Sequence, residues 1–270
     1  MPELPEIYTL ALQMKTELVG KKITGIEVRQ EKCLNVPVSD FTGLINGKTI
    51  DSVSSRGKWI FVKLDPDVFF LLSLGMGGNV VYHKPGGSMP EKYQLKFDFS
   101  DGTSLTIGFW WFGYAHAVRE SELKGHKMTA SLGVSPLDDY EFTHKRFESL
   151  LAGKKGGIKS FLMDQDNIAG IGNVYIQDIL FKSRLHPNRK IPQITEDEKK
   201  KLFRAIVDSL GTAAELGGLA YEKDLYDRPG KFKDFLVGYK EGKPCPECGS
   251  AIVKIKTGST ASFICPDCQK

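Results

Sequence analysis

The chain has 270 residues, of which 41% are hydrophobic and 26% are charged. This composition excludes the disordered class and allows one large core or two moderate ones. The net charge of +4 is uneven: residues 1–150 carry 17 basic against 18 acidic residues, and residues 151–270 carry 20 against 15. Solvated surface charges are enough to explain the excess of basic residues in 151–270, so this excess favours a polyanionic partner only slightly. With no signal-peptide pattern and no apolar run of roughly 20 residues, we expect a cytosolic protein.

The amino terminus reads Pro2-Glu3-Leu4-Pro5-Glu6 after Met1. Removal of Met1 would leave Pro2 with a free secondary amine. An α-amino group titrates at roughly pH 8, so part of it would be unprotonated near neutrality, and Glu3 beside it can move the proton. An amine next to an acid is the minimum equipment for Schiff-base chemistry. An ordinary helix start is the other interpretation, with proline in the first turn and Glu6 at the positive end of the dipole. The terminus alone leaves both open.

After the amino-terminal helix, the first half of the chain is predicted to be mostly β. Short alternating or apolar runs are separated by turn signals such as Asp65-Pro66 and Asp101-Gly102, at a spacing typical of an antiparallel sandwich or barrel. The predicted strands are Ile23 to Val28, Thr49 to Val53, Trp59 to Leu64, Val68 to Leu74, Tyr93 to Phe99 and Ser104 to Phe109.

From Asp138 the period of the apolar residues becomes helical. Helices are predicted around 142–151, 158–163, 176–182 and 196–216. The expected organisation is α+β and multidomain, with an N-terminal antiparallel β-sandwich domain at 1–132, a linker at 133–137, a helical domain at 138–226, and a loop plus a small C-terminal unit at 227–270.

The segment from Ile158 to Tyr175 reads as a helix, a turn hinged on Gly170 and Gly172, and a second helix. The glycines allow backbone amides to approach a phosphate, with Asn173 at the start of the second helix. A plain helical hairpin has the same spacing, and spacing alone favours it.

Four of the five cysteines lie in the last 26 residues as two C-x-x-C pairs, Cys245 and Cys248, then Cys265 and Cys268. Four thiolates at this spacing converge on one tetrahedral ion, so we predict one structural zinc. Two short apolar runs between the pairs indicate a zinc ribbon, whose folding energy would come largely from the metal. Cys33 stands alone and is expected to be buried.

These motifs occur together and in order, along with Arg56-Gly57-Lys58 and Leu74-Gly75-Met76. The chain resembles the formamidopyrimidine-DNA glycosylase and endonuclease VIII family of base-excision repair over essentially its whole length. The resemblance implies a catalytic β-sandwich domain, a helix-two-turn-helix DNA-binding domain and a zinc ribbon. It further implies double-stranded damaged DNA as the partner, no small-molecule cofactor, no membrane association, and a bacterial cytosolic or nucleoid location. We expect a monomer, because two domains that enclose asymmetric damaged DNA need no second, symmetry-related copy of the chain.

The resemblance also implies the catalytic residues. Pro2 would attack C1′ of a flipped damaged nucleotide and form an imine, Glu3 would move protons at the sugar, and Lys58 would contact a nearby phosphate. Glu6 is implied as a structural partner at the helix start. The implied activity is a bifunctional DNA glycosylase and abasic-site lyase.

Further residues match DNA-contacting positions of the family. Lys159 and Asn173 match phosphate contacts, which fix register without reading sequence. Met76 matches the apolar side chain that is wedged into the stack, and Phe112 matches the aromatic wedge on the opposite strand.

Three positions depart from the family pattern. Trp110 stands where an arginine recognises the orphaned base, Thr260 where an arginine grips phosphate, and Ser73 where a histidine is common. An indole stacks but cannot form bidentate hydrogen bonds. We therefore expect a divergent member that prefers oxidised pyrimidines, abasic sites or an unusual lesion over 8-oxoguanine opposite cytosine. The alternatives are a catalytically weak damaged-DNA-binding relative and a zinc-ribbon nucleic-acid module without catalysis.

Overall fold

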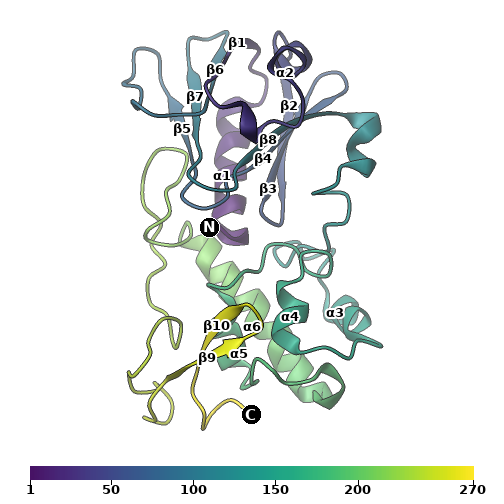
Figure 1. Cartoon of the computed structure of the whole chain (residues 1–270), viewed down its shortest axis with the longest axis vertical. Helices are drawn as coiled ribbons and strands as arrows, with labels where there is room; N and C mark the ends of the chain where they lie inside the picture. The colour runs from purple at the N-terminus through teal and green to yellow at the C-terminus, as the bar shows by residue number, and fades with distance from the viewer. The chain divides into compact units, whose positions relative to one another are not determined.

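The computed structural model describes all residues, 1–270, and the chain forms two compact units (Figure 1). Unit 1 comprises Met1–Ser131 and Leu216–Phe232, and unit 2 comprises Leu132–Glu215 and Lys233–Lys270. The chain therefore returns to unit 1 after its longest helix, and residues 216–226, predicted with the helical domain, belong to unit 1 by their contacts. The predicted boundaries of the functional domains stay predictions.

Unit 1 consists of two α-helices, two short 3-10 helices and two four-stranded antiparallel sheets (Figure 1). One sheet has the strand order β1-β6-β7-β5 and the other β2-β3-β4-β8. The elements are α1 (Leu4–Leu18), β1 (Ile23–Val28), η1 (Glu31–Cys33), α2 (Val38–Ile45), β2 (Ile50–Arg56), β3 (Trp59–Leu64), β4 (Val68–Ser73), β5 (Asn79–His83), β6 (Leu95–Phe99), β7 (Ser104–Gly108), β8 (Tyr114–Arg119) and η2 (Glu120–Gly125).

The core of unit 1 joins α1 to both sheets. Ile7, Leu10 and Met14 recur at helical spacing on one face of α1 and are buried in the same cluster as strand residues from each sheet. Phe70 of β4 and Phe97 of β6 meet with their ring centroids 5.1 Å apart, which links the sheets directly. This packing fixes the amino end of α1 relative to the strands.

The six predicted strands are all present, with ends shifted by up to three residues. Strands β5 and β8 were not predicted. β5 directly follows Gly77 and Gly78, and β8 contains alanine and histidine, which have no strong β preference. Both strands form because they complete the edges of sheets, a tertiary effect.

Unit 2 contains α3 (His144–Leu151), α4 (Ile158–Met163), α5 (Ile176–Lys182), η3 (Ile191–Gln193), α6 (Glu196–Glu215), β9 (Val253–Thr257) and β10 (Thr260–Ile264). Its helices begin close to the predicted positions. β9 and β10 form the antiparallel hairpin of the predicted ribbon (Figure 1). No helix is both long and apolar enough to span a lipid bilayer.

The turn between α4 and α5 is held by one side chain. Gln165 Nε2 donates to the carbonyl oxygens of Met163 and Ile171 at 2.9 Å, and its Oε1 accepts from Gly170 N at 2.9 Å. Gly170 has a φ of 106°, which favours glycine. The predicted linker packs on this turn, since Val134 is buried and pairs with Ile168.

Candidate functional site

The amino end of α1 is buried and held by Glu6. Pro2, Glu3 and Glu6 are all buried. One carboxylate oxygen of Glu6 accepts from Glu3 N at 2.8 Å, and the other accepts from Leu219 N at 3.0 Å. Because both oxygens serve backbone amides, Glu6 joins the start of the helix to the returning segment 216–232. This supports its predicted structural role and fixes the backbone that carries Pro2 and Glu3.

A second carboxylate, Glu222, lies beside the amino terminus. The Met1 amino group is 3.6 Å from Glu222 Oε1, whose side chain is mostly buried. Burial raises the pKa of Glu222, and the neighbouring amino group opposes the shift. Sequence reasoning missed this residue, because no motif distinguishes it from the other charges of the loop at 217–231.

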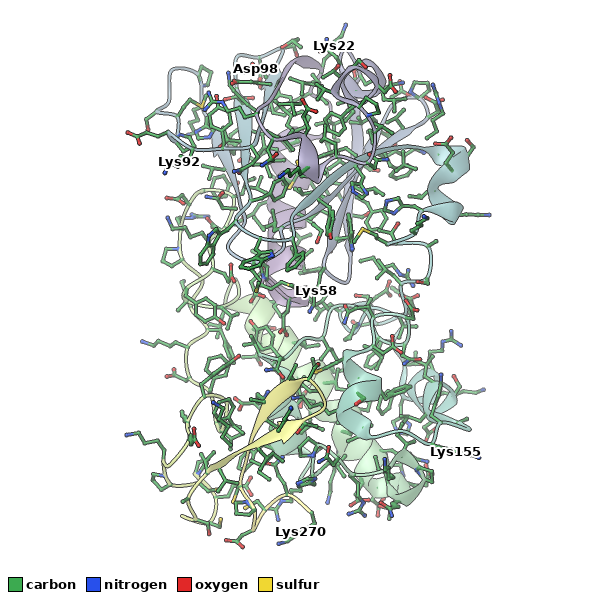
Figure 2. All side chains as sticks on the ribbon, viewed as in Figure 1. Lys22, Lys58, Lys92, Asp98, Lys155 and Lys270 are labelled. Atoms are coloured by element: carbon green, nitrogen blue, oxygen red, sulfur yellow. The ribbon has the colours of Figure 1, made fainter.

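Lys58 lies at the tip of the β2–β3 hairpin. Arg56 pairs with Trp59, which leaves a two-residue turn of Gly57 and Lys58, and Gly57 has a φ of 59°. Figures 1 and 2 show Lys58 at the end of unit 1 where the chain begins. Lys58 is half-buried, and its ammonium has no ion-pair partner. It is therefore available to an anion.

The hairpin that presents Lys58 packs on an aromatic and histidine cluster in which Trp59 and His116 are buried and Tyr114 and His126 are half-buried. Trp59 stacks on Tyr114 at a centroid distance of 6.0 Å, and His116 Nδ1 lies 2.8 Å from His126 Nε2. Burial, aided by the neighbouring His126, lowers the pKa of His116 to about 4. Burial also lowers the pKa of His126, whose Nδ1 lies 2.8 Å from Thr129 Oγ1. Both rings are therefore neutral at pH 7.

Met76 and Phe112 are brought together by two interlocking turns. Met76 N donates to Trp111 O at 2.8 Å, and Trp111 N donates to Met76 O at 3.1 Å. Gly75 has a φ of 58°, and a Cβ there would collide with the backbone of Trp111 and Phe112. The two predicted wedge residues thus lie on adjacent, backbone-bonded turns.

The side chains of these turns face solvent. Met76 is 39% exposed, Trp110 82%, and Trp111 and Phe112 58% each. The Trp111 and Phe112 rings stack with centroids 5.7 Å apart. Phe112 has a φ of 56°, an uncommon conformation for an aromatic residue. A strained, exposed aromatic turn is typical of a contact site.

Lys159 is almost completely buried within unit 2, at 2% exposure. Its Nζ donates to Thr260 Oγ1 and Ala261 O at 2.9 Å and to Ser262 Oγ at 2.8 Å. Burial lowers the pKa of Lys159 to about 8. The ammonium therefore places positive charge beneath β10 and joins the predicted contacts Lys159 and Thr260. Whether either meets phosphate stays a prediction.

Asn173 lies in the turn before α5 and is half-buried. Its carbonyl oxygen and Oδ1 accept from Gln177 Nε2 at 2.8 and 3.2 Å. Gln177 Oε1 in turn accepts from Phe263 N at 3.0 Å. Gln177, which no sequence motif marks, thereby ties Asn173 to the ribbon. The Asn173 side-chain NH2 forms no hydrogen bond within the protein, so a phosphate can accept from it.

The four predicted cysteines form one cluster in which all Sγ atoms lie within 4.8 Å of one another. Cys245 Sγ is 3.8 Å from Cys268 Sγ, and Cys248 Sγ is 3.4 Å from Cys265 Sγ. A tetrahedron with Zn–S distances of about 2.3 Å has edges of about 3.8 Å, so the cluster fits zinc. All four positions are thiolates, which makes the single ion structural.

Comparisons with known proteins agree with this arrangement. Three family models match: the formamidopyrimidine-DNA glycosylase N-terminal domain at residues 1–108, its H2TH domain at 132–224, and the zinc finger found in FPG and IleRS at 242–270. The formamidopyrimidine-DNA glycosylase of Pelotomaculum thermopropionicum is 36% identical over 100% of this chain and 99% of the relative. That of Halalkalibacterium halodurans is 33% identical over 100% of both.

Solved structures are similar as well. Lactococcus lactis Fpg in complex with N7-benzyl-Fapy-dG DNA has a TM-score of 0.90 and 26% identity over 100% of both chains. Its complex with DNA containing an abasic site has a TM-score of 0.90 and 26% identity over 99% of both chains. These matches confirm the predicted fold class, the zinc ribbon and the enzyme class. The chain belongs to the formamidopyrimidine-DNA glycosylase family.

Proposed function

We propose that this DNA glycosylase of base-excision repair removes a damaged base and then cleaves the abasic site through an imine on Pro2. The observation that carries the proposal is the amino end of α1, where Pro2 and Glu3 are buried side by side and Glu6 is committed to backbone amides. A nucleophile and an acid are thereby held next to each other on a fixed backbone.

The chemistry follows from an amine whose pKa lies near neutrality once Met1 is removed. The unprotonated Pro2 nitrogen attacks C1′ as the bond to the base breaks, and the base leaves with a proton. Ring opening gives an iminium between Pro2 and C1′. The iminium acidifies C2′, so loss of a C2′ proton expels the 3′ phosphate, and a second elimination expels the 5′ phosphate. Glu3 moves these protons, and Lys58 neutralises a phosphate beside the reacting sugar.

The grip on DNA is divided between the two units. In unit 1, Met76 and Phe112 enter the base stack. In unit 2, Asn173 and Thr260 donate to backbone phosphates, and Lys159 beneath Thr260 adds positive charge. Damaged DNA is the partner of the solved relatives.

Lesion preference is the second part of the proposal. Trp110 has no hydrogen-bonding fork for an orphaned cytosine, so we expect oxidised pyrimidines or abasic sites to be processed faster than 8-oxoguanine opposite cytosine. Excision rates on a panel of single-lesion duplexes test this. Fastest excision of 8-oxoguanine opposite cytosine would refute the preference.

Borohydride trapping tests the imine. The Met1-processed protein is incubated with duplex DNA containing one abasic site and reduced, alongside the Pro2→Gly and Glu3→Gln proteins. A covalent adduct that is lost or strongly reduced in Pro2→Gly supports the mechanism. Tight binding without an adduct would instead identify a damage-binding relative that does not catalyse.

Cellular location and assembly are part of the same proposal. The similar curated glycosylases come from bacteria, which supports a bacterial cytosolic or nucleoid location.

We also propose that the protein is a monomer. Sedimentation equilibrium checks the mass against 30.0 kDa, and a stable mass of twice that value would contradict it.

A further inference from the structure

Glu222 has a mostly buried carboxylate whose one partner is the amino terminus. Its side chain is 13% exposed, and its Oε1 lies 3.6 Å from the Met1 nitrogen. The carboxylate has no other ion-pair or hydrogen-bond partner within the protein. Burying a carboxylate is costly unless it is paired. Because the imine on Pro2 requires removal of Met1, this ion pair is lost in the mature protein, and a carboxylate buried without it is a candidate for catalysis.

The backbone around Glu222 is fixed by the same residue that fixes the start of α1. Glu6 Oε1 accepts from Leu219 N at 3.0 Å, and Glu222 N donates to Leu219 O at 3.0 Å. A Cβ at Gly218 would lie 2.7 Å from the Glu6 side chain, so the returning segment packs directly against it. The turn at 219–222 therefore places Glu222 at a set position beside the amino end of α1.

The chain that follows Glu222 is bonded to the same helix. Gln13 Oε1 accepts from Leu225 N at 2.9 Å, and Gln13 Nε2 donates to Asp224 Oδ2 at 3.0 Å. Glu222 thus lies between two attachments of its segment to α1. A carboxylate fixed on both sides in this way suits proton transfer, which requires a set geometry between donor and acceptor.

Met1 occupies the place that the sugar takes in the imine. Here the Met1 carbonyl carbon is bonded to Pro2 N, and in the imine C1′ forms the bond at that position. The nitrogen is planar in both, as an amide or as an iminium. Met1 C therefore stands for C1′, and in one of the two iminium geometries Met1 Cα stands for C2′. The Met1 nitrogen then stands for a substituent on C2′, so Glu222 Oε1, 3.6 Å away, lies next to the C2′ protons.

The positive charge of the Met1 amino group also has a counterpart in the reaction, because the iminium is a cation attached to the same Pro2. Burial raises the pKa of Glu222, and the neighbouring amino group opposes the shift. A carboxyl group with a pKa closer to neutrality accepts a proton more readily. A cation beside it keeps the group ionised until the proton is transferred.

We propose that Glu222 is a catalytic residue of the lyase step, in which its carboxylate removes the C2′ proton of the iminium on Pro2. The carboxylate oxygen bonds to the proton as the C2′–H bond breaks. That electron pair forms C1′=C2′, and the iminium nitrogen regains its lone pair. The lone pair then re-forms the iminium, the C1′=C2′ pair moves to C2′=C3′, and the 3′ phosphate leaves with the electrons of the C3′–O bond. Glu222 returns its proton to solvent.

This inference rests on the proposed function, because it requires the imine on Pro2. It goes further by dividing the proton transfers between two carboxylates. Glu3, next to the nucleophile, moves the protons of base removal, and Glu222, on the returning segment, moves the C2′ proton of strand cleavage. Glu6 cannot take part, since both of its oxygens accept from backbone amides.

Single-turnover reactions on duplex DNA with one abasic site separate imine formation from strand cleavage. The Met1-processed protein and Glu222→Gln are followed by borohydride trapping and, without borohydride, by strand cleavage. We expect Glu222→Gln to form the trapped adduct within about threefold of the unchanged rate and to cleave the strand at least about 100-fold more slowly. Asp227→Asn is the matched control, because Asp227 is an exposed carboxylate of the same segment, and both rates should stay unchanged.

Deuterium at C2′ of the abasic site gives a readout that a purely structural role would not change. Deuteration should slow strand cleavage by Glu222→Gln more than it slows cleavage by the unchanged protein, because proton removal becomes the slowest step. Glu222→Asp keeps a carboxylate and should cleave faster than Glu222→Gln, with the adduct formed as before.

Strand cleavage by Glu222→Gln within about threefold of the unchanged rate would overturn the proposal. Loss of adduct and cleavage together, in a protein that circular dichroism shows to be folded, would also overturn it. If Glu222→Gln does not fold, Glu222→Asp decides, and equal slowing of its two rates counts against the proposal. Absence of an adduct with the unchanged protein refutes the imine on Pro2 itself, whereas an adduct with unslowed cleavage in Glu222→Gln refutes the role of Glu222 alone.

Discussion

The amino end of α1 and the aromatic loop at residues 109–114 differ in the burial of their functional side chains. At the amino end, Glu3 and Glu6 are buried, and both oxygens of Glu6 accept hydrogen bonds. In the loop, the backbone is bonded while Trp110 and Phe112 are left exposed. The difference follows from the tasks. Proton transfer requires groups fixed to within fractions of an ångström, whereas stacking requires an uncovered surface on a rigid support.

The zinc cluster depends most strongly on contacts inside the protein, because one ion joins four cysteine side chains. We therefore expect the largest effect of a substitution there. Cys248→Ala should release the ion, unfold the β9–β10 hairpin and weaken DNA binding, because the metal supplies most of the folding energy of such a unit, about 10 kcal/mol or more. Metal analysis and DNA titration measure both effects, and circular dichroism should show that the β-sandwich remains folded. Unchanged zinc content and unchanged binding would contradict the assignment.

A substitution of Glu6 tests how the buried amino end of α1 is stabilised. Glu6→Ala removes the carboxylate that accepts from the buried amides of Glu3 and Leu219, and each such lost hydrogen bond at a buried group costs about 1 to 3 kcal/mol. We therefore expect the free energy of unfolding to fall by about 2 to 5 kcal/mol. Urea denaturation measures it, with Asp51→Asn as an exposed acidic control in the same unit. A loss equal to that of the control would show that Glu6 is not structural.

Acid should weaken the support of the Lys58 hairpin. The pKa of His116 is about 4 when folded against an ordinary value of 6.5, so between these pH values the unfolded chain binds more protons. Stability therefore falls as pH falls below 6.5, by about 2 kcal/mol at pH 5, with the loss levelling off below pH 4. The lowered pKa of His126 acts in the same direction.

Urea unfolding at pH 7 and pH 5, followed by fluorescence of the buried Trp59, measures this loss. The His116→Gln protein should show a clearly smaller difference between the two pH values, because it lacks the titrating ring. The same difference in both proteins would assign the acid sensitivity to other groups.

The smallest effect on stability is expected in the aromatic loop. Trp110→Ala removes a side chain that is 82% exposed, so the free energy of unfolding should change by less than about 0.5 kcal/mol. Thermal denaturation checks this value. A much larger loss would mean that Trp110 supports the fold, and the contrast between the two regions would disappear.

The sequence predicted the parts of this molecule that have a local signature. The spacing of Cys245, Cys248, Cys265 and Cys268 predicted the zinc site, and apolar periodicity predicted six strands and most helices. Residues whose function depends on tertiary contacts were missed. Glu222 meets the amino terminus across more than 200 residues of chain.

The burial of Lys159 illustrates the same limit. Its ammonium donates hydrogen bonds to the β9–β10 hairpin, about 100 residues away along the chain. No sequence pattern around 158–163 indicates this contact. Likewise β8 forms because β4 offers it a partner. Such features depend on which distant segments meet, which local propensity does not encode.

The most direct test of the central claim is to locate the trapped sugar by mass spectrometry after tryptic digestion. The peptide from Pro2 to Lys15 has no lysine before its last residue, so an adduct on it with normal cleavage after Lys15 must lie on the amine of Pro2. We predict this adduct. An adduct on a peptide containing Lys58 or another lysine, with Pro2 unmodified, would contradict the mechanism.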